Sequence, residues 1–338
     1  MILTLPMAEV IKQAWPGAVV AVLASEGNAE VARHHPDVDR VLVDSREAKG
    51  SGFGDMRPLV RQLRAGHFDI AVLVHPTPRL ALAAWWAGIP VRVGTAYRAY
   101  SVLFNVRVPQ HRRGQPVHES EFNLALLRPL GIVPPGPARG VKWAIRNDER
   151  KRAEAVLSEA GARSPYVVLH PGNGGSARNW SPEQYAAFGR LLQAEGYCLL
   201  VTGSGRERDL AEQVARRIGP AARSLAGLLS LGELAAVLER AALFVGSSTG
   251  PTHLAAILGT PVVALFAPLR SQTPERWQPL GPRVTVAQPD PPELCPRCPG
   301  ATCPASLCME HRLSLDRVWA HAEPLLRQAT AGARWAPR

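Results

Sequence analysis

The sequence lacks the features of a membrane-spanning or exported protein. None of its apolar runs approaches the roughly 18 residues that a spanning helix needs. Residues 1–6 carry neither a basic region nor a small-residue cleavage site, so no signal peptide is predicted. We also find no internal repeat and no low-complexity segment. We therefore expect a globular protein of the cytoplasm.

Cysteine is scarce and unevenly distributed. Five cysteines occur in 338 residues, which suits a reducing compartment. Four of them lie close together, namely Cys295, Cys298, Cys303 and Cys308. A strong zinc signature has two Cys-x2-Cys pairs, whereas this segment has one. We expect reduced cysteines in a packed loop and no metal or cofactor, with zinc and disulfides as the alternatives.

Acidic residues are almost missing from one part of this basic chain. The formal net charge is +11, and the segment from Arg57 to Arg113 has a single acid, Asp69, among its many arginines. Such a concentration of positive charge favours an acidic partner: a phosphorylated glycolipid, an anionic membrane or a nucleotide. An arginine-rich coding bias is the alternative explanation. Nucleic acid is not favoured, because no aromatic-interleaved basic motif or helix-turn-helix pattern accompanies the charge.

Length and composition indicate two globular domains. A chain of 338 residues with 46% hydrophobic residues can form two cores. Strand-like and helix-like segments alternate, which predicts parallel sheets with helices on both faces. A proline-rich stretch at residues 132–150 is typical of a linker. We expect domains at residues 1–145 and 146–315, followed by a C-terminal helix and tail at 316–338.

The periodicity of apolar residues predicts the elements. Strands are expected at residues 18–23, 41–43, 68–74, 91–93, 166–169, 197–202, 243–245, 262–266 and 284–286. Helices are expected at residues 6–15, 58–65, 79–87, 118–130, 182–194, 207–218, 231–240, 253–258 and 314–328. Residues 45–55 and 95–117 are expected to be irregular. Too few residues precede the first helix for the leading strand of a doubly wound sheet, so we expect that strand to be missing.

The second half is organised around residues 244–266. An apolar strand runs into Gly246-Ser-Ser-Thr-Gly250, and Pro251 suits the first turn of the helix that follows. Free N–H groups and the helix dipole make such a place an anion site, and His253 can reach the same anion. The alternative is an ordinary turn of a parallel α/β domain that binds nothing.

Two further loops are expected at the same edge of this sheet. His170-Pro-Gly-Asn-Gly-Gly-Ser-Ala-Arg178 follows one predicted strand, and Thr202-Gly-Ser-Gly205 ends the next. Ligands of open α/β sheets bind beyond the carboxyl ends of the strands. These loops are therefore candidates for one binding site.

Several motifs, in order, resemble glycosyltransferase family 9, the ADP-heptose:lipopolysaccharide heptosyltransferases and their relatives. They are His170-Pro-Gly, Arg178-Asn-Trp-Ser-Pro-Glu183, Thr202-Gly-Ser-Gly205 and Ser248-Thr-Gly-Pro-Thr-His-Leu-Ala-Ala256, with weaker matches at residues 3–17 and 118–127. The resemblance implies a GT-B fold, in which two Rossmann-like doubly wound domains face each other across a cleft. It also implies inverting transfer of a sugar from a nucleotide-sugar donor without an obligatory metal.

The resemblance also assigns site residues. Arg178 matches the family's basic residue and would meet the negative charge that grows on the leaving diphosphate. Glu207 would accept hydrogen bonds from a ribose or from the transferred sugar. The expected donor-binding set is His170, Gly172, Arg178, Gly203, Glu207, Ser248, Thr249, Gly250 and His253. The simpler alternatives are a surface arginine at Arg178, a helix-start histidine at His253 and a helix-dipole acid at Glu207.

Two departures from the family pattern matter. The family's catalytic base is an aspartate that would fall one residue before Met1, and inverting transfer needs a base for the acceptor hydroxyl. We expect a start codon placed too late, and a truncated or inactive protein is the alternative. The family often has aspartate where this chain has Ser248, which leaves the exact donor sugar open.

The predicted protein moves a heptose or related sugar from an ADP-sugar to a lipopolysaccharide-core-like or other anionic saccharide. The acceptor is expected at Arg92, Arg98, Arg112 and Arg113, with peripheral electrostatic contact to the inner leaflet of the cytoplasmic membrane. The alternative is a catalytically inactive nucleotide-sugar-binding protein.

Overall fold

The computed structural model of the chain describes residues 1–44, 55–112, 114–175, 177–269, 272–289 and 307–331. The chain divides into two compact units, Met1–Val141 and Lys142–Arg338, and each is considered by itself. Within the described ranges, no helix has the length and apolar character that crossing a membrane requires.

The second unit is built on one parallel sheet of six strands. The strands are β6 (Tyr166–His170), β7 (Cys198–Val201), β8 (Ala222–Ser224), β9 (Leu243–Ser247), β10 (Val262–Leu265) and β11 (Val284–Ala287). Their order, β11-β10-β9-β6-β7-β8, is the Rossmann order, in which the chain starts in the middle and builds outward in both directions. The central strands β6, β9 and β10 are buried at every residue, as expected for a sheet covered on both faces.

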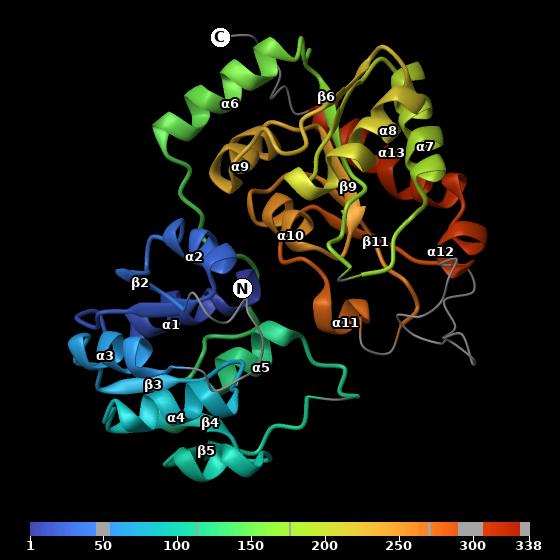
Figure 1. Cartoon of the computed structure of the whole chain (residues 1–338). Coiled ribbons are helices and arrows are strands. Elements are labelled where there is room, and N and C mark those ends of the chain that lie inside the picture. The colour runs from blue at the N-terminus through green and yellow to red at the C-terminus, as the bar shows by residue number, and fades with distance from the viewer. Residues whose placement is uncertain (45–54, 113, 176, 270–271, 290–306, 332–338) are drawn as a thin grey trace. The chain divides into compact units, whose positions relative to one another are not determined.

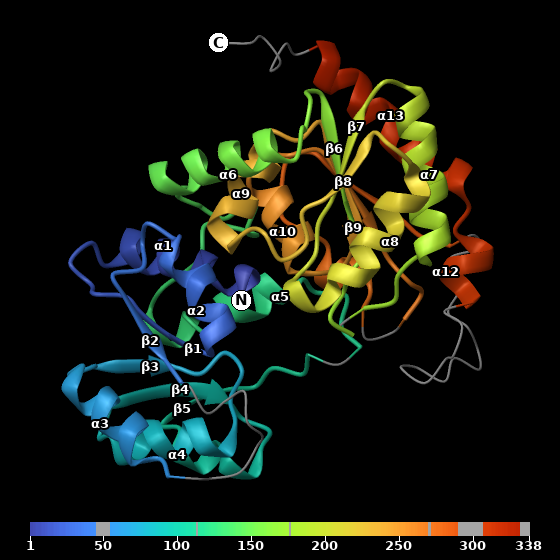
Figure 2. The same ribbon diagram turned by 45° about the horizontal axis from the view of Figure 1, so that its top comes forward.

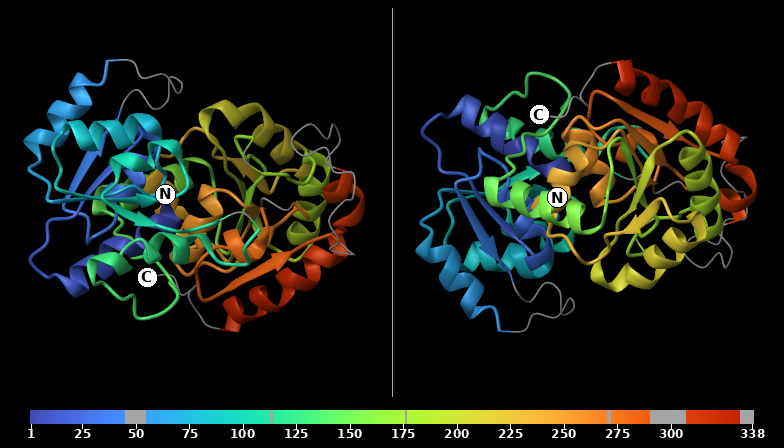
Figure 3. Two further views of the ribbon diagram at one scale, coloured as in Figure 1. Left: turned by 90° about the horizontal axis from the view of Figure 1, so that it is seen from below. Right: turned by 90° about the horizontal axis from the view of Figure 1, so that it is seen from above.

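Helices cover both faces of this sheet (Figure 2). On one face lie α7 (Pro182–Ala194), α8 (Arg208–Ile218) and α13 (Leu315–Ala331), and on the other α9 (Leu231–Glu239) and α10 (Gly250–Ile257). Leu169, Val201 and Val245 form one core with the first set. Figure 3 shows α13 in red beside the orange edge strand β11, which it contacts. Shorter elements complete the unit: η5 (Gly205–Glu207), α11 (Pro274–Trp277) and α12 (Leu307–Arg312).

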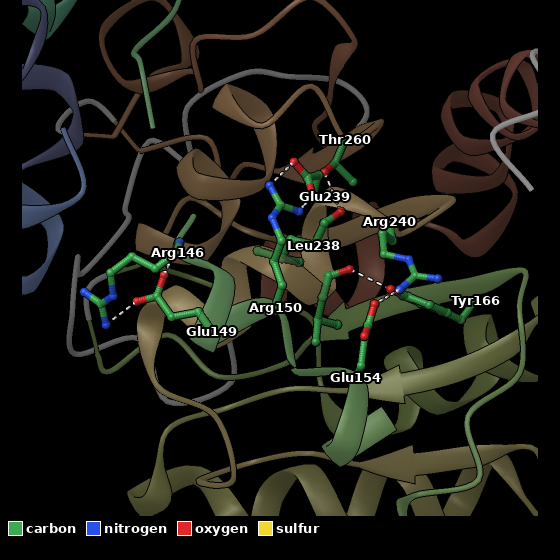
Figure 4. Close-up of polar contacts among 10 residues, drawn as sticks. Arg146, Glu149, Arg150, Glu154, Tyr166, Leu238, Glu239, Arg240 and Thr260 are labelled. Carbon is green, nitrogen blue, oxygen red and sulfur yellow. Dashed lines mark hydrogen bonds and ion pairs between the residues drawn. The ribbon is translucent and has the colours of Figure 1, made fainter. Parts of the chain in front are cut away.

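Polar contacts fasten α6 (Asn147–Glu159) to α9 (Figure 4). Arg150 forms a two-pronged ion pair with Glu239. Arg240 Nη1 lies 3.1 Å from Glu154 Oε1. Glu149 is buried, and its carboxylate accepts a hydrogen bond of 2.8 Å from the Arg146 N–H. Helix α6 also buries Ala153 and Val156, so the exposed ion pairs are one part of what holds it in place.

The first unit contains two separate parallel sheets (Figure 1). One pairs β1 (Ala21–Ala24) with β2 (Arg40–Val43), and the other has the order β3 (Ile70–Val72), β4 (Val91–Thr95) and β5 (Val106–Val108). In the Rossmann order a leading strand lies between the strands equivalent to β1 and β3. The described residues contain no such strand and no pairing of β1 with β3, so the expected absence is confirmed.

The first unit's helices surround these sheets (Figure 1). They are η1 (Ile2–Thr4), α1 (Pro6–Ala14), α2 (Glu26–Arg33), α3 (Arg57–Ala65), α4 (Pro78–Trp86), η3 (Ala99–Leu103), α5 (Glu119–Ala125) and η4 (Arg128–Leu130). A two-pronged ion pair between Asp44, after β2, and Arg79, in α4, links the two sheets. Both side chains are largely buried, so the pair is shielded from water.

The prediction of elements was wrong in several places. Residues 95–117 were expected to be irregular, but they contain β5 and η3. The expected helix at 118–130 is interrupted, since α5 ends at Ala125 and η4 follows. The elements α2, α6, β8, α11 and α12 were not predicted. Most of the loop expected at residues 45–55 lies outside the described residues.

Gly232 in α9 leaves room for the buried Glu149 carboxylate, and this predicts a coupled effect on stability. A Cβ at Gly232 would lie 2.0 Å from Glu149 Oε1. Gly232→Ala should therefore lower the free energy of unfolding by about 1–3 kcal/mol. In a Glu149→Ala background the same change should cost much less, as urea unfolding of the four proteins would show. If Gly232→Ala lowered the free energy of unfolding equally in both backgrounds, the contact with Glu149 would be contradicted.

Candidate active site

The loops expected to form a site follow adjacent strands of the second unit. Strands β6 and β9 are neighbours, with His170 paired to Gly246, and here the strand order reverses direction. The loop after β6 and the loop after β9 therefore leave the sheet side by side and diverge to opposite faces. The loop after β7 adjoins the first, because β7 pairs with β6. The structure thus brings the predicted donor loops to one edge.

His170 is a buried, neutral residue at the carboxyl end of β6. Its Nδ1 lies 2.9 Å from Thr202 Oγ1, a residue that directly follows β7. Burial lowers the pKa of His170 to about 4, and the nearby Glu207 carboxylate opposes this only in part. The imidazole therefore stays uncharged near pH 7 and joins two loops rather than presenting a cation to a ligand.

Glu207 is the centre of the contacts between the loops. Its carboxylate accepts hydrogen bonds from the Gly174 N–H (3.1 Å), the Ser204 N–H (2.9 Å) and the Ser204 hydroxyl (2.8 Å). Burial alone would raise the pKa of Glu207, but these hydrogen bonds outweigh it and lower the pKa below its usual value. Glu207 is therefore a firmly ionised carboxylate at the carboxyl edge of the sheet.

Two of the three predicted site glycines, Gly172 and Gly203, lie against Glu207. A Cβ on Gly172 would lie 2.3 Å from the Glu207 carboxyl carbon, and one on Gly203 would lie 3.2 Å from its Cβ. Gly172 is thus required because the carboxylate packs directly against its backbone. The sequence showed the glycines and the acid, but not that they form one cluster.

Asparagines shape the loop that carries Arg178. Asn173 accepts from the Gly175 N–H (2.8 Å) and donates to the Ala177 carbonyl (2.7 Å). The buried Asn179 donates to the Pro171 carbonyl (2.7 Å) and accepts from Tyr185. Arg178 is half-buried at the end of this braced loop. The hydrogen bonds of Asn173 and Asn179 therefore fix the backbone on either side of Arg178.

The loop after β9 opens helix α10. Thr249 is the residue that precedes the helix, and its side chain makes no capping hydrogen bond to the first turn. Instead the Thr249 hydroxyl lies 3.2 Å from Thr252 Oγ1, and Thr252 donates to the Ser247 carbonyl. Gly250 is exposed, Ser248 is half-buried and His253 is largely buried. This helix start can therefore offer backbone N–H groups to an anion.

The predicted acceptor arginines that lie within the described residues have different surroundings. Arg92 lies near the amino end of β4, where its side chain donates to the carbonyls of Ile89, Pro90 and Leu103. Arg112 is ion-paired with the buried Glu119 at 2.5 Å. Arg98 is exposed, and Arg113 lies outside the described residues.

An exposed aromatic pair was missed by the sequence reasoning. Tyr97 and His111 stack with ring centroids 3.7 Å apart and an interplanar angle of 21°. They follow the carboxyl ends of β4 and β5, and Arg98 is next to Tyr97. Tyr97 was visible in the sequence, but its partner could not be identified without β5.

One of the four clustered cysteines lies within the described residues. Cys295, Cys298 and Cys303 lie outside the described residues, whereas Cys308 in α12 packs against the core of the second unit. Among the described residues no group of three or more His, Cys, Asp or Glu side chains is arranged to hold a metal ion.

The sheet order and its carboxyl-edge loops define a Rossmann-type α/β protein, and comparison with known proteins identifies its family. The profile of glycosyltransferase family 9 (heptosyltransferase) matches residues 56–305. The chain belongs to this family and is a glycosyltransferase.

Individual relatives agree with this assignment. Lipopolysaccharide heptosyltransferase 3 of Escherichia coli K12 is 28% identical over 283 residues, which cover 79% of this chain and 78% of the relative. The solved structure of a family 9 glycosyl transferase from Veillonella parvula has a TM-score of 0.79 at 21% identity, and covers 96% of this chain and 93% of that one. The structure of E. coli ADP-heptose lps heptosyltransferase II has a TM-score of 0.75 at 22% identity, covering 97% and 95%. The structural likenesses show that the fold is of the GT-B class.

The neutral His170 predicts a particular pH dependence of stability. In the unfolded chain a histidine has a pKa near 6.5, whereas the buried ring has a pKa of about 4. The unfolded state therefore takes up a proton first as the pH falls, and stability is lost between these values, by about 3 kcal/mol in all. His170→Asn should flatten this part of the unfolding-against-pH curve. Curves of equal slope for the two proteins would contradict a buried neutral ring.

Proposed function

We propose that the chain transfers a heptose or related sugar from an ADP-sugar to a lipopolysaccharide-core-like or other anionic saccharide, with inversion and without a required metal. The observation that carries the proposal is the convergence of three loops at the switch point between β6 and β9, where the start of α10 faces the same edge. Dinucleotides and nucleotide sugars bind Rossmann sheets at this place.

The donor's diphosphate is proposed to bind at the start of α10. The first-turn N–H groups at Thr249 and Gly250, together with His253, would contact the phosphate oxygens. Arg178 would meet the charge that grows on the leaving diphosphate as the glycosidic bond breaks. Such fixed donors replace the role that a metal ion plays in other transferases.

Glu207 and its glycines are proposed to bind hydroxyl groups of the donor. Three donors already contact this carboxylate, which leaves about one of its four acceptor positions for a ligand. An ionised carboxylate accepts strong hydrogen bonds from ribose or sugar hydroxyls. Ser248, which replaces the family's frequent aspartate, would contribute a neutral hydroxyl beside the sugar and so relax the choice of donor sugar.

The acceptor is proposed to bind the first unit at Arg98. Exposed Arg98 can pair with an acceptor phosphate or carboxylate, and the adjacent Tyr97–His111 stack offers flat surface to a sugar ring. Arg112 would act indirectly by holding Glu119 at the start of α5.

A transfer assay tests the reaction. The protein is mixed with ADP-heptose and a deacylated lipopolysaccharide core in excess EDTA, and release of ADP is measured, with UDP- and GDP-sugars as controls. We expect acceptor-dependent release of ADP that EDTA does not reduce. Failure to bind any ADP-sugar would contradict the proposal, and abolition by EDTA would contradict its metal-independent part. Binding of ADP-heptose without release would favour the inactive binding protein.

Two arginine variants separate the donor and acceptor sites. Arg178→Ala should weaken binding of ADP-heptose by about 10- to 100-fold, because a charge-assisted contact to the diphosphate is lost. Arg98→Ala should leave donor binding unchanged but raise the acceptor KM about 10-fold. Calorimetry with ADP-heptose and steady-state kinetics give these values, and each variant is the control for the other. An equal loss of donor binding in both variants would contradict the separate assignments.

A further inference from the structure

Two tryptophans are exposed at the end of α4. Trp85 is 52% exposed and Trp86 is 45% exposed, although large aromatic side chains usually contribute to a core. The residues that α4 does bury, Ala81, Ala83 and Ala84, are small. The alanines of the helix thus face inward, and its two tryptophans face solvent. A helix selected only for stability would bury its large apolar side chains instead.

A third apolar side chain lies on the adjoining segment. Val102 in η3 is 72% exposed, and η3 contacts α4. The end of η3 is tied to the loop after α4, because Asn105 donates to the Pro90 carbonyl at 2.6 Å and Arg92 donates to the Leu103 carbonyl at 2.8 Å. We call Trp85, Trp86 and Val102 together the tryptophan patch, since all three are exposed and lie on two elements that are in contact.

Cations border the tryptophan patch on α3. Arg57, Arg61 and Arg64 are spaced by four and three residues, so they share the exposed face of α3, opposite the buried Leu59, Val60 and Leu63. Helix α3 packs against α4 (Figure 1). Arg64 Nη2 donates to the Trp86 carbonyl at 2.8 Å. Asp55 lies 3.9 Å from Arg57 in an exposed ion pair, and from residue 56 to residue 112 the sequence has one further acid, Asp69.

This combination fits an anionic lipid surface. Tryptophan favours the region between lipid headgroups and acyl chains, and arginines beside it are attracted to the negative potential of phosphate headgroups. A protein partner would have to match both a tryptophan pair and an almost acid-free basic border. An anionic bilayer offers an interfacial region for the tryptophans and phosphate groups for the arginines. It is also the surface on which a glycolipid acceptor is presented.

We propose that the tryptophan patch and the Arg57-Arg61-Arg64 face of α3 form a peripheral docking surface for an anionic bilayer, with Trp85 and Trp86 inserted among the headgroups. The proposal deepens the proposed function, since it rests on an acceptor that is carried by a membrane. Docking would keep the first unit at the lipid surface without a spanning helix. Two weak attractions would add together: insertion of the tryptophans among the headgroups and attraction of the arginines to the phosphates.

Vesicle flotation of the full chain, without donor or acceptor, tests the docking surface. We expect binding to vesicles that contain phosphatidylglycerol, weak binding to pure phosphatidylcholine, and release by salt. The double variant Trp85→Ser/Trp86→Ser and the variant Arg61→Ser should each reduce binding by about tenfold or more. Trp15→Ser is the matched control, because Trp15 is 38% exposed and lies outside the patch.

The outcomes separate this proposal from the proposed function. Equal binding by the wild type and the double tryptophan variant would overturn the docking surface. So would a tryptophan-dependent dimer in sedimentation that binds no vesicles, which would indicate a second copy of the chain as the occupant. Transfer to a deacylated, water-soluble acceptor should be the same in the wild type and in all variants, so failure of that reaction would concern the proposed function alone.

Discussion

The reversal of strand order between β6 and β9 is the constraint on which the candidate site depends. Because consecutive strands build outward from β6 in one direction and from β9 in the other, their following loops must part at this point. The loop after β9 leads directly into α10, whose first residue is Gly250. The topology therefore brings the start of a helix to this edge before any side chain is specified, which is the feature that the proposed donor site uses.

Side chains then fix this place in one geometry. Glu207 accepts hydrogen bonds from two loops, and the neutral His170 joins the ends of β6 and β7 through Thr202. Each group has a pKa displaced in the direction that preserves its role, ionised for the carboxylate and uncharged for the imidazole. Groups that are held in this way need little reorganisation, which is what the proposed transfer requires when charge develops on a leaving group.

Local signals made much of the second unit predictable. Helix α7 has the predicted bounds, because Ser181 caps it and Pro182 occupies its first turn. Strands β6 and β9 were found because buried strands are continuous apolar runs. By contrast, α6 is held by ion pairs to α9 that are distant in sequence, and β5 is a three-residue strand that contains Arg107. The contact of Gly172 with Glu207 and the Tyr97–His111 stack were hidden for the same reason: each depends on the packing of segments, not on local pattern.

The most direct test of the account is hydrogen exchange of the whole chain with and without ADP, followed by mass spectrometry of peptides. Binding at the switch point predicts slower exchange in the peptides that contain Gly172–Gly175, Gly203–Glu207 and Thr249–His253, because their N–H groups border the proposed ligand. Peptides from the strands and loops of residues 91–112 should exchange at unchanged rates. Protection confined to the first unit, with none in the three loops of the second, would contradict the central claim.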